Sequence, residues 1–146
     1  MNMAITKLDT IDALVLNCMD YHMIAPVTEY LERRGLRGKY DQIVLAGGAI
    51  GVMADENSAW AETFWQHVKL ARDLHGIHKI LVIDYRDCGA CKAFVGKECA
   101  NERAGETAIH QSWMTALQAE INKREPELDV ELLLMDLDGS VETLDP

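Results

Sequence analysis

Short apolar runs alternate along this chain with longer segments whose apolar residues recur every three or four positions. Short apolar runs are typical of strands buried in a parallel sheet. The runs predict strands at Ala13–Asn17, Gln42–Ala46, His78–Asp84, Asp129–Leu137 and Val141–Leu144. The last run follows the pair Asp138-Gly139, which favours a hairpin turn, so we expect that strand to return antiparallel.

The segments with helical spacing fill the intervals between these strands. They predict helices at Pro26–Arg34, Glu56–His75 and Glu102–Arg124, and a short helix entered from the loop Arg86–Lys92. Strands that alternate with helices are typical of a parallel sheet covered on both faces. We therefore expect an α/β fold, a three-layer α/β/α sandwich with four mostly parallel strands and a short antiparallel C-terminal edge strand. A length of 146 residues suits one domain over residues 1–146.

Composition and charge narrow the class of protein. The chain is 49% hydrophobic and 26% charged, as globular proteins in solution are. It has no apolar run of about 18 residues and no signal-peptide pattern, so we expect a cytoplasmic protein without a membrane partner. A net charge of −10 argues against binding to nucleic acid or to anionic membranes, because both need a basic surface.

Residues that could bind a ligand or take part in catalysis follow the ends of three predicted strands. In open parallel sheets, ligands bind in the crevice beyond the carboxyl ends of the strands. The topology therefore predicts one crevice that gathers Cys18, Asp20, His22, Gly47, Gly48 and the segment Tyr85–Cys91. The four cysteines point to metal binding, redox chemistry or simple burial. In a reducing compartment we do not expect disulfides, and Cys99 has no partner pattern.

Four segments resemble motifs of the beta-class carbonic anhydrases, and together they span residues 11 to 144. They are Cys18-Met19-Asp20, Ala46-Gly47-Gly48, Asp87-Cys88-Gly89-Ala90 and the hairpin Asp138-Gly139-Ser140-Val141. The resemblance implies a zinc enzyme that adds water to carbon dioxide or to a similar small electrophile such as carbonyl sulfide. It also implies a homodimer or a dimer of dimers.

The resemblance also implies a set of site residues. In that family two cysteines and one histidine hold one zinc, and a water or an aspartate takes the fourth position. Carried over, the metal ligands are Cys18, Cys88 and Asp20, and Asp20 can instead orient the zinc-bound hydroxide. The expected substrate pocket is lined by Gly47, Gly48, Tyr85 and Gly89.

The chain departs from the family pattern at two important positions. Tyr85 stands where the family has its histidine ligand, and His22 stands where it has the arginine that pairs with the aspartate. A phenol with a pKa near 10 is a poor zinc ligand beside two thiolates. Arg86 could supply the lost positive charge, so Asp20 and Arg86 are the candidate catalytic residues.

A fourth ligand could come from His22, Tyr85 or Cys91. An extended chain would separate the side chains of Cys18 and His22 by about 13 Å, so His22 needs a turn after Cys18. Cys91 forms a Cys-x-x-Cys pair with Cys88, a spacing common in zinc knuckles.

Three functions stay open on the sequence. The first is the hydratase. The second is a relative without hydratase activity that binds a metal or a small anion. The third is a thiol redox protein, because Cys88-Gly89-Ala90-Cys91 lies between a strand and a helix. An open, water-bearing metal position would separate the first from the second.

Overall fold

The computed structural model describes residues 4–96, 99 and 102–144. Its five-stranded sheet has the order β2-β1-β3-β4-β5. The first four strands pair in parallel, and β5 pairs antiparallel with β4. The strands are β1 (Ala13–Asn17), β2 (Tyr40–Val44), β3 (Lys79–Tyr85), β4 (Asp129–Met135) and β5 (Val141–Thr143). This arrangement confirms the predicted fold class.

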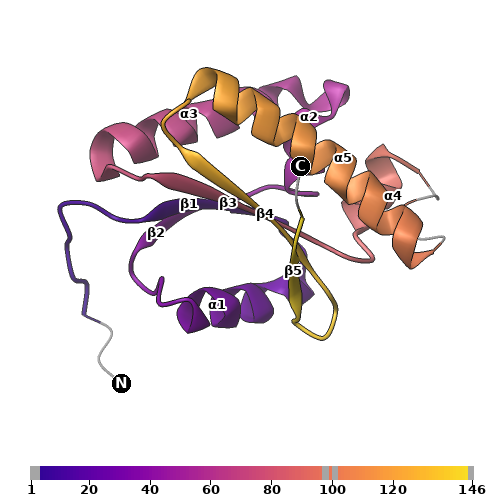
Figure 1. Ribbon diagram of the computed structural model, residues 1–146, viewed down its shortest axis with the longest axis horizontal. Coiled ribbons are helices and arrows are strands. Elements are labelled where there is room, and N and C mark those ends of the chain that lie inside the picture. Colours follow the sequence, from indigo (N-terminus) through magenta and orange to yellow (C-terminus); the bar gives the residue numbers. More distant parts are fainter. Residues whose placement is uncertain (1–3, 97–98, 100–101, 145–146) are drawn as a thin grey trace.

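Helices cover both faces of the sheet, which makes three layers (Figure 1). α1 lies on one face, and α2, α3 and α5 lie on the other. The helices are α1 (Ile24–Arg33), α2 (Ala49–Met53), α3 (Ser58–His75), α4 (Gly89–Phe94) and α5 (Arg103–Arg124), with 3-10 turns η1 (Tyr21–Met23) and η2 (Asp55–Asn57). Within the described part of the chain, no helix is long and apolar enough to cross a membrane.

The side-chain alternation of the strands divides the core into two clusters. Leu14 and Leu16 of β1 face the layer of α3 and α5, whereas Val15 faces α1. All three side chains are buried, because both faces of a parallel sheet are covered. This explains why β1 reads as an apolar run in the sequence.

The boundaries differ from the prediction mainly around the second strand. β2 begins at Tyr40 and ends at Val44, and the residues that follow form a turn into the short helix α2, which the sequence reading missed. Gly48, the residue just before α2, has a φ of +54°, and a Cβ there would lie 2.4 Å from Asp84 Oδ1. A glycine is therefore required for this close approach to β3.

The strand order also positions the crevice. From β1 the chain crosses through α1 to β2 on one side, while β3 pairs with the other side of β1. The carboxyl ends of β1 and β3 therefore meet where the connections diverge, which is where open α/β sheets bind ligands. Cys18 follows β1 directly, and Cys88 follows β3 by three residues.

Candidate active site

The two predicted cysteine ligands, Cys18 and Cys88, come together as a buried pair of free thiols. The Cys18 sulfur accepts hydrogen bonds from the Cys88 thiol and from the backbone N–H groups of Gly47, at 3.2 Å, and Asp20. These bonds, led by the one from Cys88, lower the pKa of Cys18 to about 6. The same bond and burial raise the pKa of Cys88. The pair therefore holds one thiolate and one thiol at neutral pH.

A buried carboxylate supports the loop that holds Cys18. Asp84 accepts a hydrogen bond from the Ala49 N–H at 3.1 Å, and its other oxygen lies 3.2 Å from His110 Nδ1. Asp84 thereby fixes the start of α2 behind Gly47, whose N–H binds Cys18. The side chains of Asp84 and His110 are each 1% exposed. The sequence reading missed both, because isolated polar residues carry no signal of their own.

Tyr85 and His22, which stand where the family has a histidine and an arginine, both contact Asp20. The Tyr85 hydroxyl donates a short hydrogen bond to Asp20 Oδ2, and His22 Nδ1 lies 2.6 Å from Asp20 Oδ1. Burial and this hydrogen bond raise the pKa of Tyr85, so the phenol stays protonated. The required turn after Cys18 exists as η1, and it brings His22 back to Asp20. His22 and Tyr85 also contact each other edge to face.

An apolar pocket of about 560 Å³ opens above Asp20 and Tyr85. It lies between η1 and the first helical turns after Cys88, and is lined by Cys18, Met19, Asp20, Tyr21, Ala46, Tyr85, Gly89, Ala90, Ala93 and Phe94. Two of the four predicted pocket residues, Tyr85 and Gly89, line it. Gly47 and Gly48 instead lie behind Cys18 and against Asp84.

Arg86 does not face the crevice, contrary to its predicted catalytic role. Its guanidinium is buried and lies 3.1 Å from Glu106, 2.5 Å from Glu142 and 3.7 Å from Asp136. It also donates to Thr107 Oγ1 at 2.7 Å. Three carboxylates already neutralise this charge, so Arg86 cannot take over the arginine's part beside Asp20.

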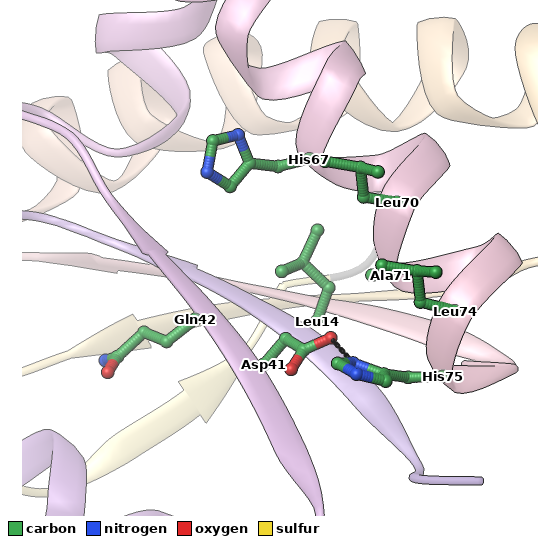
Figure 2. A pocket seen from close by; sticks show the side chains of 8 residues that line it. All are labelled: Leu14, Asp41, Gln42, His67, Leu70, Ala71, Leu74 and His75. Atoms are coloured by element: carbon green, nitrogen blue, oxygen red, sulfur yellow. Dashed lines mark hydrogen bonds and ion pairs between the residues drawn. The ribbon is translucent and has the colours of Figure 1, made fainter. Parts of the chain in front are cut away.

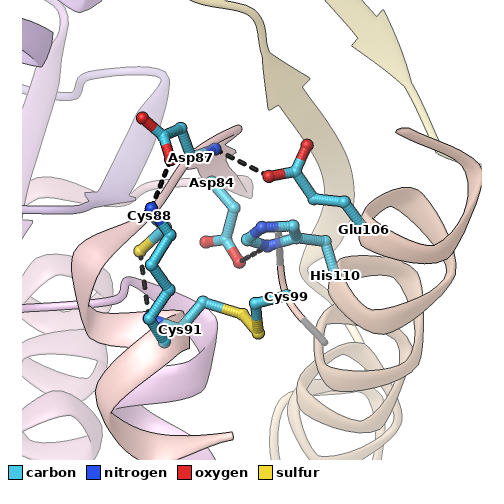
Figure 3. The surroundings of a disulfide bond; sticks show 8 residues. Asp84, Asp87, Cys88, Cys91, Cys99, Glu106 and His110 are labelled. Atoms are coloured by element: carbon cyan, nitrogen blue, oxygen red, sulfur yellow. Dashed lines mark hydrogen bonds and ion pairs between the residues drawn. A yellow bond between two sulfur atoms is a disulfide. The ribbon is translucent and has the colours of Figure 1, made fainter. Parts of the chain in front are cut away.

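Cys91 and Cys99 form a disulfide, against the expectation that the chain has none (Figure 3). Cys91 in this state is not available as a fourth metal ligand, and it does not form the Cys-x-x-Cys disulfide with Cys88 that a thioredoxin-like protein would need. Cys88 is a free thiol that accepts a hydrogen bond from the Cys91 N–H at 3.3 Å. The pairing with Cys99 was missed because proximity in the fold, not spacing in the sequence, creates it.

A second hollow lies between α3 and the edge strand β2 (Figure 2). It measures about 210 Å³ and contains the pair His75 and Asp41, whose Nδ1 and Oδ2 atoms lie 2.6 Å apart. None of the predicted site residues lines it. We therefore place the candidate active site at Cys18, Asp20, Tyr85 and Cys88.

Comparison with known proteins identifies the family of this fold and site. Residues 9–145 match the model of a family described as "Putative carbonic anhydrase", and the chain belongs to that family. An uncharacterised protein of Rickettsia conorii is 29% identical over 143 residues, which cover 98% of this chain and 77% of that protein. One of Rickettsia bellii is 27% identical over 137 residues, covering 94% and 84%.

Solved structures confirm the beta-carbonic anhydrase fold. The beta-carbonic anhydrase CcaA has a TM-score of 0.59 at 12% identity, covering 94% of this chain and 81% of its own. The Coccomyxa enzyme has a TM-score of 0.58 at 14% identity, covering 93% and 72%. Isoform I from Trichomonas vaginalis has a TM-score of 0.56 at 17% identity, covering 96% and 87%. The chain is thus a divergent, beta-carbonic anhydrase-like protein.

The donor atoms fit the zinc of this family only in part. Cys18 and Cys88 supply two adjacent soft sulfur donors, one of them a thiolate, which is the chemistry zinc prefers. The third predicted ligand, Asp20, is engaged with Tyr85 and His22 instead. Across the described ranges of the chain, no three His, Cys, Asp or Glu side chains are arranged to hold a metal ion. Zinc therefore fits the sulfur pair, and a third ligand requires Asp20 to leave Tyr85.

Proposed function

We propose that the crevice is a hydratase site of the carbonic anhydrase type, for carbon dioxide or a similarly small electrophile. The observation that carries the proposal is the pairing of Cys18 and Cys88 beside a carboxylate, in a chain that belongs to the carbonic anhydrase family. The apolar wall of the adjoining pocket supports it, because a small uncharged substrate gains from an apolar surface.

In this proposal zinc would be held by Cys18, Cys88 and Asp20, once Asp20 has left Tyr85. When bound there, it would supply an acidified water as the nucleophile. The chain's own residues prepare that step. The N–H groups of Gly47 and Asp20 stabilise the Cys18 thiolate, and before a metal binds the Tyr85 hydroxyl holds Asp20 within the crevice. Tyr85 and His22 thus take the place of the family's arginine as the hydrogen-bond partners of the aspartate.

A second function is favoured by a specific observation. The protonated phenol of Tyr85 donates a hydrogen bond to Asp20, so the carboxylate has a partner without a metal ion. A family member in this state would bind a small molecule in the pocket of about 560 Å³ without hydrating it. We further propose a homodimer or a dimer of dimers, supported by the tetrameric beta-carbonic anhydrases of Sordaria macrospora, which share the fold at a TM-score of 0.54.

Metal content separates the two functions. The wild-type chain, purified without a chelator or a histidine tag, is compared with Cys88→Ser by elemental analysis, and stopped-flow hydration of carbon dioxide follows. The matched control is the double variant Cys91→Ser/Cys99→Ser, which removes both disulfide cysteines and keeps the two thiols of the crevice. The hydratase predicts about one zinc per chain in wild type and control, none in Cys88→Ser, and hydration that follows the zinc. A metal-free, inactive wild type would contradict it and favour the binding protein.

A further inference from the structure

Two polar residues lie on the buried face of α5, in its N-terminal half. The buried residues of this helix are Glu106, His110, Met114, Leu117 and Ile121. The last three are apolar and pack in the core, whereas packing alone does not account for the histidine. His110 is 0% exposed, and no described residue gives its Nε2 atom a hydrogen-bond partner. A buried polar atom without a partner lowers stability, so a leucine would pack here at lower cost.

The other ring nitrogen of His110 has a specific partner. Its Nδ1 atom lies 3.2 Å from Asp84 Oδ2, and Figure 3 shows the two side chains pointing toward each other. A carboxylate only accepts hydrogen bonds, so Nδ1 is the donor. His110 therefore fixes the direction of a carboxylate that is itself buried in the core.

Asp84 in turn holds the loop beside Cys18. Its Oδ1 atom accepts a hydrogen bond from the Ala49 N–H at 3.1 Å, and it leaves no room for a Cβ at Gly48. Two residues before Ala49, the Gly47 N–H donates to Cys18 Sγ at 3.2 Å. A path of hydrogen bonds and one tight loop thus connects His110 on α5 with the sulfur of Cys18.

Glu106, one turn earlier on the same face of α5, contacts a different segment of the chain. Its Oε2 atom accepts a hydrogen bond from the Asp87 N–H at 2.7 Å, next to Cys88 in the sequence. Asp87 has a φ of +57°, which is uncommon for a residue other than glycine and needs such support. The two polar residues of α5 therefore make separate contacts, one toward Cys18 and one toward Cys88.

We propose that His110 and Asp84 are positioning residues for Cys18. They hold the loop Gly47–Ala49 in place, and the Gly47 N–H in turn fixes the Cys18 sulfur at the crevice. Both residues act through this loop and not on a substrate. The role goes beyond the proposed hydratase and needs no metal, and only its effect on metal affinity rests on that function.

Amide hydrogen exchange of the metal-free protein, followed by NMR at one pH, tests the role. His110→Leu fills the site but removes the donor, whereas His110→Asn keeps a donor near the position of Nδ1 and leaves space. Cys18→Ala removes the acceptor of the Gly47 N–H and sets the scale. None of these substitutions is adjacent to Gly47 in the sequence, so the intrinsic exchange rate of its amide stays the same.

The Gly47 amide should exchange about tenfold faster in His110→Leu than in wild type, approaching its rate in Cys18→Ala, because its hydrogen bond is weakened. The Asp87 amide, which Glu106 holds, should keep its rate. His110→Asn should keep slow exchange at both amides, since the donor to Asp84 remains.

Two results would overturn the proposal. Equal acceleration of the Gly47 and Asp87 amides would show that His110 only anchors α5, and unchanged Gly47 exchange in His110→Leu would show that the loop does not depend on it. If His110→Leu does not fold, His110→Asn decides. Slow Gly47 exchange in that variant supports the positioning role, and exchange as fast as in Cys18→Ala overturns it.

Cadmium binding, measured from the thiolate-to-metal absorbance, tests the consequence for the metal site. Loss of a residue that supports a metal ligand typically costs about 10- to 100-fold in affinity, so His110→Leu should bind cadmium at least about tenfold more weakly than wild type or His110→Asn. Equal affinities in wild type and His110→Leu would overturn the positioning role at the metal site. A wild-type chain that binds no cadmium would contradict the proposed hydratase, while the Gly47 amide still decides the positioning role.

Discussion

Tyr85 is the last residue of β3 and Arg86 follows it, yet their side chains lie in different environments. Tyr85 faces the crevice and donates a hydrogen bond to Asp20. Arg86 points away and is surrounded by Glu106, Glu142 and Asp136. Successive side chains of a strand alternate between its two faces, so neighbours in the sequence reach different environments. The permanent charge here stabilises the fold, while a neutral donor serves the candidate site.

Of the variants considered, Arg86→Met is expected to lower the unfolding free energy most, because it leaves the buried Glu106 carboxylate without its cation. Breaking a buried ion pair from one side costs about 3–5 kcal/mol of unfolding free energy. Urea denaturation measures the loss.

Two variants control this result. Arg103→Gln removes an exposed arginine from Asp136 and should change the unfolding free energy far less, because solvent screens that pair. Adding Glu106→Gln to Arg86→Met should recover part of the loss. Equal losses for Arg86→Met and Arg103→Gln would show that burial does not distinguish the two arginines.

On the crevice side, Tyr85→His should raise zinc affinity by about tenfold or more, because an imidazole replaces a phenol in the third ligand position and Asp20 is released. Hydration of carbon dioxide should rise with it. The matched variant is Tyr85→Phe, which removes the hydroxyl but adds no ligand. If Tyr85→His binds zinc and stays inactive, the missing arginine partner of Asp20, not the missing histidine, is the defect.

The thiol pair predicts a pH dependence for the metal-free protein. The folded-state pKa of Cys18, about 6, lies below its ordinary value of 9.0. Between these values the unfolded chain binds the extra proton, so this group stabilises the fold increasingly as pH rises from 6 to 9, and the contribution is lost as pH falls through 6. The raised pKa of Cys88 acts only above this window.

Denaturation across the window, with thiolate absorbance, measures this effect. Cys18→Ser should flatten the rise in unfolding free energy between pH 6 and 9. A wild-type chain whose stability does not change over that range would contradict the assignment of Cys18 as the thiolate.

The smallest effect is expected from Asp41→Asn in the hollow between α3 and β2. The pair with His75 is partly exposed, and such pairs contribute at most about 1 kcal/mol. Zinc content and hydration should not change, since the hollow shares no lining residue with the crevice. A loss of zinc in this variant would show that the two regions are coupled.

Much of the fold could be predicted because its signals are local. The buried strands β1 and β3 read as apolar runs, and Gly76 ends α3 in the left-handed conformation that favours glycine. The helix α2 was missed because its residues are nearly all buried and apolar, so no polar face marks a helical period. The strand predicted before it extended to Ala46 because Leu45 and Ala46 continue the apolar run past Val44, where β2 ends.

The sequence by itself determined the fold class and the meeting of Cys18 with Cys88, because parallel strands bring their carboxyl ends to one edge. Only the tertiary structure decided the partners of individual side chains. It turned Arg86 away from the crevice, joined Cys91 to Cys99, and directed both Tyr85 and His22 onto Asp20. These outcomes depend on side-chain direction and on contacts between distant segments. Residue type and spacing do not encode them locally.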